Sequence, residues 1–260
     1  MEQNPQQSKV NKNLNIFHAV FPPEYSGKSV HPRTLDNLNT WTNFTPDISF
    51  VRKVYDYEEA SSFISEHFDN ELLRYFQIQP DGRFKADLWR LCVLYIYGGI
   101  YTDIDQELLS PIDSFLDINK YSFCGVTNME RYNLSNGFIY ARPNHPIIKK
   151  NIELTYERYR EAKQGPSLTN VKFIGGCYIM GAASSALTGE KLMPLGSHLI
   201  NDDKCLFLHE KGDTSLRDSN KQAFWNSFGV YSDPHSRVMN SRYSSYHTDR
   251  RLRNQFVAIT

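Results

Sequence analysis

Apolar residues recur along this chain with two spacings, and each spacing predicts a different kind of element. Short apolar or alternating runs at 14–21, 48–55 and 100–102 are typical of buried strands. Longer segments with apolar residues three and four positions apart are typical of helices. The helices predicted in this way cover residues 31–44, 56–68, 84–99, 145–162 and 175–189.

The order of these elements predicts the fold class. Two further strands are predicted at 121–126 and 137–142, whereas the chain after residue 190 shows only loops and short apolar pieces. Strands and helices alternate, which is typical of an α/β domain with a mostly parallel sheet. Residues 1–12 are polar and predict a flexible tail, so we expect one domain over residues 13–260.

Segment 84–99 has the clearest helical pattern, and Gly98-Gly99 supplies residues that can end a helix in the left-handed conformation. Its apolar stripe consists of Ala86, Trp89, Val93 and Ile96. The strand that follows delivers Asp103 at its carboxyl end. Ligands of open α/β sheets bind beyond such ends, so we expect a site here.

The triplet Asp103-Ile104-Asp105 is the first candidate for that site. In an extended segment, both carboxylates point to one side and Ile104 points into the core. Two such close carboxylates repel each other unless they share a proton, a metal or a cationic partner. A solvated acidic turn is the alternative interpretation.

Asp87 and Arg90 form a second candidate pair on the predicted helix. They are three residues apart and therefore neighbours on its surface. A surface ion pair of small energetic value is one interpretation. A carboxylate and a guanidinium directed at a polar ligand is the other, and the spacing alone does not separate them.

Composition narrows the functional classes. The 260 residues have a formal net charge of +0, which argues against a nucleic-acid partner. The four cysteines occur singly, without a C-x-x-C pair, so reduced thiols in a cytosol-like compartment are expected. No signal peptide is recognised, and no apolar run approaches the 18 residues of a membrane span.

Segment 85–113, KADLWRLCVLYIYGGIYTDIDQELLSPID, resembles the D-x-D-containing sugar-transferases of glycosyltransferase family 32. That family includes initiating α-1,6-mannosyltransferases and bacterial capsular polysaccharide enzymes, and it is distantly similar to the glucosylating domains of clostridial toxins. Weaker similarity extends the match to about 14–180. The chain departs from the family at Phe21, where tryptophan is common. The family's histidine-rich C-terminal ending is not recognisable, and 244–253 or 207–217 stands in for it.

The resemblance implies a single GT-A-like (Rossmann-like) domain with a mixed, mostly parallel central sheet. It implies a UDP- or GDP-sugar donor and Mn²⁺ or Mg²⁺. Asp105 is the implied direct metal ligand, and Asp103 is implied to reach the donor ribose or sugar and the metal's water shell. Asp87 and Arg90 are implied to hydrogen-bond the sugar hydroxyls.

The remaining site residues keep two interpretations each. Phe21 either stacks on the base or belongs to the core, Tyr101 either contacts the donor or packs, and Asn136 is either a turn residue or a donor contact. His247 and His209 compete as the third metal ligand, with His247 preferred. His18 is expected to be a core residue or one that supports the site.

The resemblance implies transfer with retention of configuration to a glycan or lipid-linked oligosaccharide. We expect a cytoplasmic protein, with peripheral association at the inner face of a membrane left open. A toxin-like effector that glycosylates a host protein is one alternative, and a non-catalytic sugar-binding relative is another. A haloacid-dehalogenase-like phosphohydrolase also uses D-x-D. That family places the aspartates near the chain start, usually with Thr or Val two residues beyond the second, whereas here the triplet begins at residue 103 and Gln106-Glu107 follows it.

Overall fold

The computed structural model describes residues 14–21, 28–43, 50–79, 81–128, 133–164, 177–189, 195–212, 227–233, 235–242 and 257–258. The predicted tail at 1–12 and His247 lie outside these residues. The division into a tail and one domain stays a prediction.

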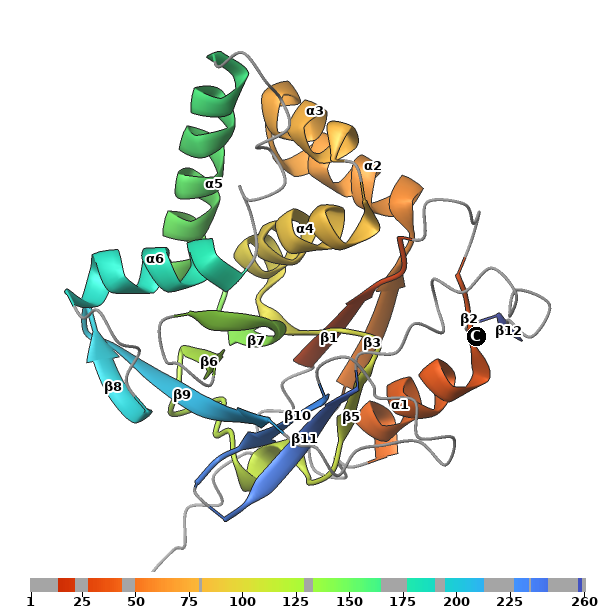
Figure 1. The fold of residues 1–260 in the computed structure, drawn as a ribbon, viewed down its shortest axis with the longest axis vertical. Helices are drawn as coiled ribbons and strands as arrows, with labels where there is room; N and C mark the ends of the chain where they lie inside the picture. Colours follow the sequence, from red (N-terminus) through yellow and green to blue (C-terminus); the bar gives the residue numbers. More distant parts are fainter. Residues whose placement is uncertain are drawn as a thin grey trace, which may run out of the picture.

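A 10-stranded mixed sheet forms the centre of the described chain, with β8 paired to β9 beside the path β3-β1-β4-β7-β6-β9-β10-β11-β5 (Figure 1). Its strands are β1 (Leu14–Ala19), β3 (Phe50–Tyr55), β4 (Gly99–Thr102), β5 (Gln106–Leu108), β6 (Phe123–Thr127), β7 (Leu134–Ala141), β8 (Gly196–Ile200), β9 (Asp203–Gly212), β10 (Ser227–Tyr231) and β11 (Arg237–Arg242). A separate two-stranded sheet joins β2 (Ser29–Val30) and β12 (Val257–Ala258).

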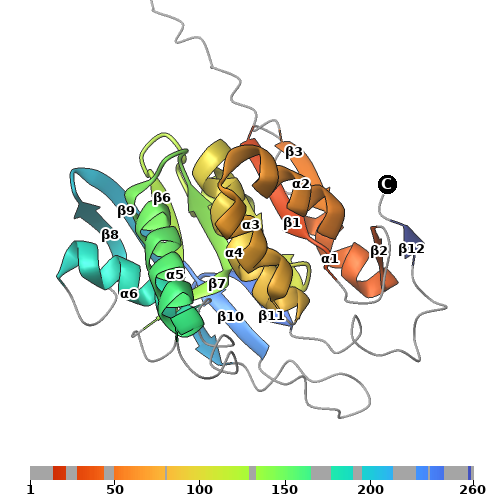
Figure 2. The same ribbon diagram turned by 90° about the horizontal axis from the view of Figure 1, so that it is seen from above.

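The helices lie on both faces of the large sheet, as Figures 1 and 2 show. They are α1 (Pro32–Asn43), α2 (Tyr57–His67), α3 (Asn70–Ile78), α4 (Gly82–Tyr97), α5 (Pro146–Gln164) and α6 (Cys177–Thr188), with a 3₁₀ turn η1 (Ile112–Ser114). Helices α2 to α6 pack on one face and share a core with Trp89 and Phe123. Helix α1 contributes Trp41 to the core on the other face. Among the described residues, no helix is both long and apolar enough to cross a bilayer.

The sequence pattern predicted β1, α1, β3, α2, α4 and β4, although it missed β2 and α3. Asp56 caps α2 through a capping box with Glu59, and both Gly98 (φ 60°) and Gly99 (φ 109°) take the left-handed backbone that ends α4. Crowding reinforces the need for glycine, because a Cβ on Gly99 would lie 2.5 Å from the Asn15 carbonyl oxygen.

The expectation of a mostly parallel sheet is wrong, although the sheet is mixed. Among the described strands, β1 pairs in parallel with β3 and β4, and β6 pairs in parallel with β9. The other six described pairs of the large sheet are antiparallel. After β4, the chain passes directly from β6 to β7, from β8 to β9 and from β10 to β11. Such direct connections produce antiparallel neighbours, whereas parallel neighbours need a longer crossover.

The position of β5 in the sheet explains why the chain turns at residues 103–105. β5 follows β4 in the chain, separated by residues 103–105, yet it lies at the opposite end of the strand order. The ribbon β10-β11-β5 therefore folds beneath the central strands, where Met239 and Leu108 share a core with Ile100 (Figure 1). Residues 103–105 are the turn at which the central sheet continues into this ribbon.

Candidate active site

The two aspartates of the D-x-D triplet lie in a turn and not in an extended segment. The Asp103 amide donates to the Gly137 carbonyl at 2.8 Å, and the Gln106 amide donates to the Asp103 carbonyl at 3.1 Å. The expectation that Ile104 points into the core is therefore wrong. The chain reverses direction here, so strand alternation does not apply: Ile104 is only partly buried, whereas Asp105 is 8% exposed.

Asp87 and Arg90 are joined to this turn and are not a surface pair. The Arg90 side chain is 4% exposed, and its Nη2 lies 3.0 Å from Asp87 Oδ1 and 3.4 Å from Asp103 Oδ1. Its Nε donates to the Ala86 carbonyl at 3.0 Å, and Nη1 donates to the Asn136 carbonyl. One guanidinium thus links α4, the turn and β7, which favours the ligand-binding interpretation over the surface one.

Tyr101 and Asn136 complete this cluster. The Tyr101 hydroxyl donates to Asp103 Oδ1 at 2.7 Å, and its ring centroid lies 4.4 Å from the Arg90 guanidinium carbon. Asn136 Nδ2 donates to Asp87 Oδ1 at 3.1 Å, while its own Oδ1 is buried without a hydrogen-bond partner. A buried acceptor without a partner is costly unless a ligand satisfies it.

Burial dominates the electrostatics of the acids. Burial, followed by the negative charge of Asp103, raises the pKa of Asp105 to about 8. Burial also raises the pKa of Asp87, although Arg90 and the amide of Asn136 oppose this shift. Arg90 also opposes the shift at Asp105, but it is the weakest of the four causes there, so a bound cation would stabilise the Asp105 carboxylate.

A hard divalent cation fits this donor set. Asp103 and Asp105 offer anionic oxygens, which Mn²⁺ and Mg²⁺ prefer over softer donors. The described residues contain no group of three His, Cys, Asp or Glu side chains that could hold a metal by themselves. His209 lies on β9, where its Nδ1 is 3.5 Å from the Thr127 hydroxyl. His247 lies outside the described residues, so the third ligand stays a prediction.

Two other predicted residues lie in the core near the site. The Phe21 ring is 7% exposed and meets the rings of Phe76 and Trp89 edge-on, so its contact with a base stays a prediction. His18 is fully buried and its Nδ1 donates to the Thr102 carbonyl at 3.0 Å. Burial lowers the pKa of His18 to about 3, so the ring is neutral and supports the strand that ends at Asp103.

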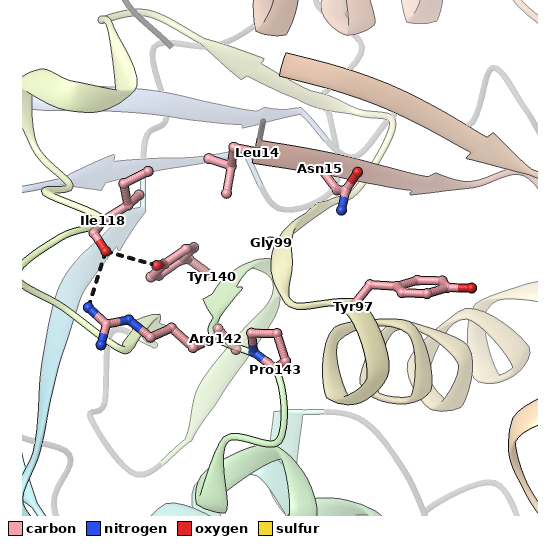
Figure 3. A pocket seen from close by; sticks show the side chains of 9 residues that line it. Leu14, Asn15, Tyr97, Gly99, Ile118, Tyr140, Arg142 and Pro143 are labelled. Carbon is pink, nitrogen blue, oxygen red and sulfur yellow. Dashed lines mark hydrogen bonds between the residues drawn. The ribbon is translucent and has the colours of Figure 1, made fainter. Parts of the chain in front are cut away.

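A pocket of about 330 Å³ lies at the opposite end of the same strands (Figure 3). It is lined by the first residues of β1 and β4 and the end of β7, including Leu14, Gly99 and Ala141. Tyr140 and Arg142 beside it both donate to the Ile118 carbonyl. The strands therefore separate this pocket from the acids, which lie at the carboxyl ends of β1 and β4.

The segment that carries these residues is similar to known glycosyltransferases. Residues 32–122 match the family model described as "Glycosyltransferase sugar-binding region containing DXD motif". An uncharacterized glycosyltransferase of Acanthamoeba polyphaga mimivirus is 27% identical over 158 residues, covering 61% of this chain and 61% of that protein. Inositol phosphoceramide mannosyltransferase 2 of Schizosaccharomyces pombe is 30% identical over 117 residues, covering 44% of this chain and 32% of that protein.

The fold has a counterpart among solved structures. The structure titled "PaToxG Glycosyltransferase" matches with a TM-score of 0.51 at 17% identity, covering 68% of this chain and 69% of that one. This likeness supports a GT-A-like α/β fold. The chain spans less than two thirds of the two curated relatives named above. Residues 32–122, which contain the acid turn and the Asp87–Arg90 pair, match the model of the sugar-binding region containing the DXD motif, and this match confirms the resemblance to that glycosyltransferase family.

Proposed function

We propose that this protein transfers a sugar from a nucleotide diphosphate donor to an acceptor hydroxyl group. The observation that carries the proposal is the cluster in which the buried Arg90 guanidinium joins Asp87, Asp103 and the Asn136 carbonyl. A purely structural ion pair does not need an unsatisfied acceptor such as Asn136 Oδ1 beside it. The same acceptor and the Asp87 carboxylate can receive hydrogen bonds from sugar hydroxyls.

Asp103 and Asp105 would hold a divalent cation at the turn. When bound, that cation supplies positive charge that neutralises the diphosphate leaving group. Arg90 is held in place by acceptors on three sides, so its guanidinium is oriented before a donor arrives. Tyr101 fixes the Asp103 carboxylate toward that guanidinium.

We further propose retention of the anomeric configuration by front-side displacement. The bond between the anomeric carbon and the phosphate oxygen breaks while the acceptor oxygen bonds to the same carbon. The acceptor proton passes to the leaving phosphate oxygen, so this scheme requires no protein base. The role of the chain is to bind and orient, which is what the Asp87–Arg90–Asp103 arrangement supports.

The names of the relatives favour particular substrates within this class. The Schizosaccharomyces pombe relative is named as a mannosyltransferase of inositol phosphoceramide, which supports a mannosyl donor and a glycan or lipid-linked acceptor. The glycosyltransferase match over residues 32–122 favours sugar transfer over the phosphohydrolase alternative. We propose a cytoplasmic protein that meets such an acceptor at the inner face of a membrane.

A calorimetric panel tests the proposed function. GDP-mannose, UDP-glucose and UDP-N-acetylglucosamine are each titrated into the full chain with Mn²⁺ and with EDTA. We expect one donor to bind with Mn²⁺ and to lose most of its affinity in EDTA. Asp113→Asn is the matched control, because Asp113 is an exposed acid in η1 and its replacement should leave donor binding unchanged. Equal affinity with and without the metal would contradict the cation site, and no binding of any donor would contradict the function.

A further inference from the structure

The residue directly after the acid turn, Gln106, is buried although it is polar. Gln106 is the first residue of β5 and is only 3% exposed. Its amide closes the turn onto the Asp103 carbonyl at 3.1 Å. Its carbonyl accepts from the Trp41 indole nitrogen at 2.9 Å, which fixes the turn to α1.

The carboxamide of Gln106 reaches back under the turn. Its Oε1 accepts from the Thr102 hydroxyl, with the two oxygens 3.4 Å apart. Thr102 is fully buried and is the last residue of β4, and its carbonyl in turn accepts from His18. Gln106 therefore connects the strand that leads into the turn with the strand that leaves it.

The backbone of β7 leaves room for this carboxamide only because residue 137 is glycine. A Cβ on Gly137 would lie 2.3 Å from Gln106 Nε2 and 3.3 Å from Asp103 Oδ2. The first distance is far below any van der Waals contact, so an alanine would push the carboxamide away. The Gln106 carboxamide is therefore packed tightly against Gly137, beside the Asp103 carboxylate.

We infer that Gln106 is a positioning residue, which holds the turn so that the Asp103 and Asp105 carboxylates can share one divalent cation. The inference rests on the cation site of the proposed function. Asp103 has other supports in Tyr101, Arg90 and the Gly137 carbonyl, so loss of the carboxamide mainly loosens Asp105. Residues that orient metal ligands typically contribute 10- to 100-fold to metal affinity.

The test measures Mn²⁺ binding to the full chain without any donor, by titration with electron paramagnetic resonance. Gln106→Met keeps the length of the side chain and removes its hydrogen bonds, and we expect it to weaken Mn²⁺ binding at least about tenfold. Gln79→Met is the matched control: it makes the same substitution at another buried glutamine, whose carboxamide donates to the Tyr75 carbonyl at the end of α3. This control should bind Mn²⁺ like the wild type.

A double-mutant cycle separates positioning from general loss of stability. Gly137→Ala alone should weaken Mn²⁺ binding, because it displaces the Gln106 carboxamide. Gln106→Ser makes room for the new methyl group, so Gly137→Ala should cost far less in that background than in the wild type. Circular dichroism establishes that each variant is folded, and the smaller Gln106→Ser variant serves as the test should Gln106→Met not fold.

Two results overturn the inference in different ways. A wild-type chain that binds Mn²⁺, with unchanged affinity in Gln106→Met and Gln106→Ser or with additive effects in the cycle, overturns the role of Gln106 alone. A wild-type chain that binds no Mn²⁺ overturns the cation site of the proposed function, and the role of Gln106 with it.

Discussion

The two sides of the acid turn differ in how their charges are balanced. On the side of α4, Asp87 faces Arg90 and the amide of Asn136, so that a partly buried carboxylate has a buried cation and a hydrogen-bond donor. On the side of β5, the neighbouring charge that acts most strongly on buried Asp105 is another carboxylate, that of Asp103. The chain itself supplies a cation for the Asp87 carboxylate, whereas the Asp105 carboxylate would need a bound cation that the described part of the chain does not supply.

This difference assigns different roles to residues of the same chemical type. The charge on Asp87 is balanced before any ligand arrives, so Asp87 and Arg90 form a rigid surface that a sugar can meet. The charge on Asp105 is unfavourable until a cation binds, so a donor with its diphosphate and metal would complete the site. Experiments that remove one charge at a time should therefore affect stability on one side and metal binding on the other.

Arg90→Ala should have the largest effect on stability. It leaves the carboxylates of Asp87 and Asp103 without their cation. Breaking a buried pair typically costs about 3–5 kcal/mol, and the loss here should lie at the lower end because both carboxylates are partly exposed and screened by solvent. Urea unfolding measures this loss. Arg83→Ala on the same helix is the control, because Arg83 pairs with Asp81 at an exposed position and should contribute below about 1 kcal/mol.

Arg90→Lys separates the effect of the positive charge from that of the guanidinium shape. Lysine keeps the charge but cannot reproduce the planar fork that reaches Asp87 and the Asn136 carbonyl together. It should retain more stability than Arg90→Ala while still losing donor binding. Normal turnover in Arg90→Lys would return the pair to a purely structural role.

Asp105→Asn should have the largest effect on transfer. The substitution keeps the shape and removes the charge that a hard cation selects, so turnover should fall by about 10²–10³ and the requirement for Mn²⁺ should rise. Asp103→Asn should respond less to added Mn²⁺, because its expected loss is in positioning the donor. Turnover is measured against Mn²⁺ concentration for both variants, and a wild-type metal response in Asp105→Asn would refute the metal site.

The two sides were also unequally predictable from the sequence. Asp87 and Arg90 lie on a helix whose apolar stripe and terminal glycines are local signals, so their proximity followed from spacing. Asp105 and Gln106 lie where the chain reverses into a strand whose partner, β11, is more than a hundred residues away. Periodicity carries no information about such a partner, so the turn was taken for an extended segment.

The same reasoning explains the other missed elements. Strands β10 and β11 have only short apolar pieces of their own, and they gain stability from each other, from β9 and from the core around Met239. Helix α3 is short, although Asp69 caps its first turn with bonds to the amides of Glu71 and Leu72. The Gln106–Gly137 contact joins distant segments, and neither residue signals it alone.

Acidification should lower the free energy of unfolding through His18, the buried histidine that supports the strand ending at Asp103. The pKa of His18 is about 3 in the folded chain, against about 6.5 when unfolded. Below pH 6.5 the His18 imidazole is protonated in the unfolded chain but stays neutral in the folded chain. The free energy of unfolding therefore falls as the pH drops from 6.5 toward 3. The slope from this group approaches about 1.4 kcal/mol per pH unit. Urea unfolding at several pH values should show a flatter profile for His18→Gln.

His145 provides the internal control for that measurement. Burial lowers the pKa of His145 to about 4, and its ring stacks on Phe123, away from the acid turn. Its contribution to the acid slope should persist in His18→Gln. An unchanged slope in His18→Gln would mean that His18 is not held neutral in the folded chain.

Ile104→Val should have the smallest effect and tests the turn directly. Ile104 is only partly buried, so losing one methylene should cost below about 0.5 kcal/mol. Ile100→Val is the matched comparison, because Ile100 is fully buried on β4 and should lose about 0.5–1.5 kcal/mol. Urea unfolding measures both under the same conditions. Equal losses at the two positions would place Ile104 in the core, as an extended segment requires, and would remove the turn on which the assignment of Asp105 and Gln106 depends.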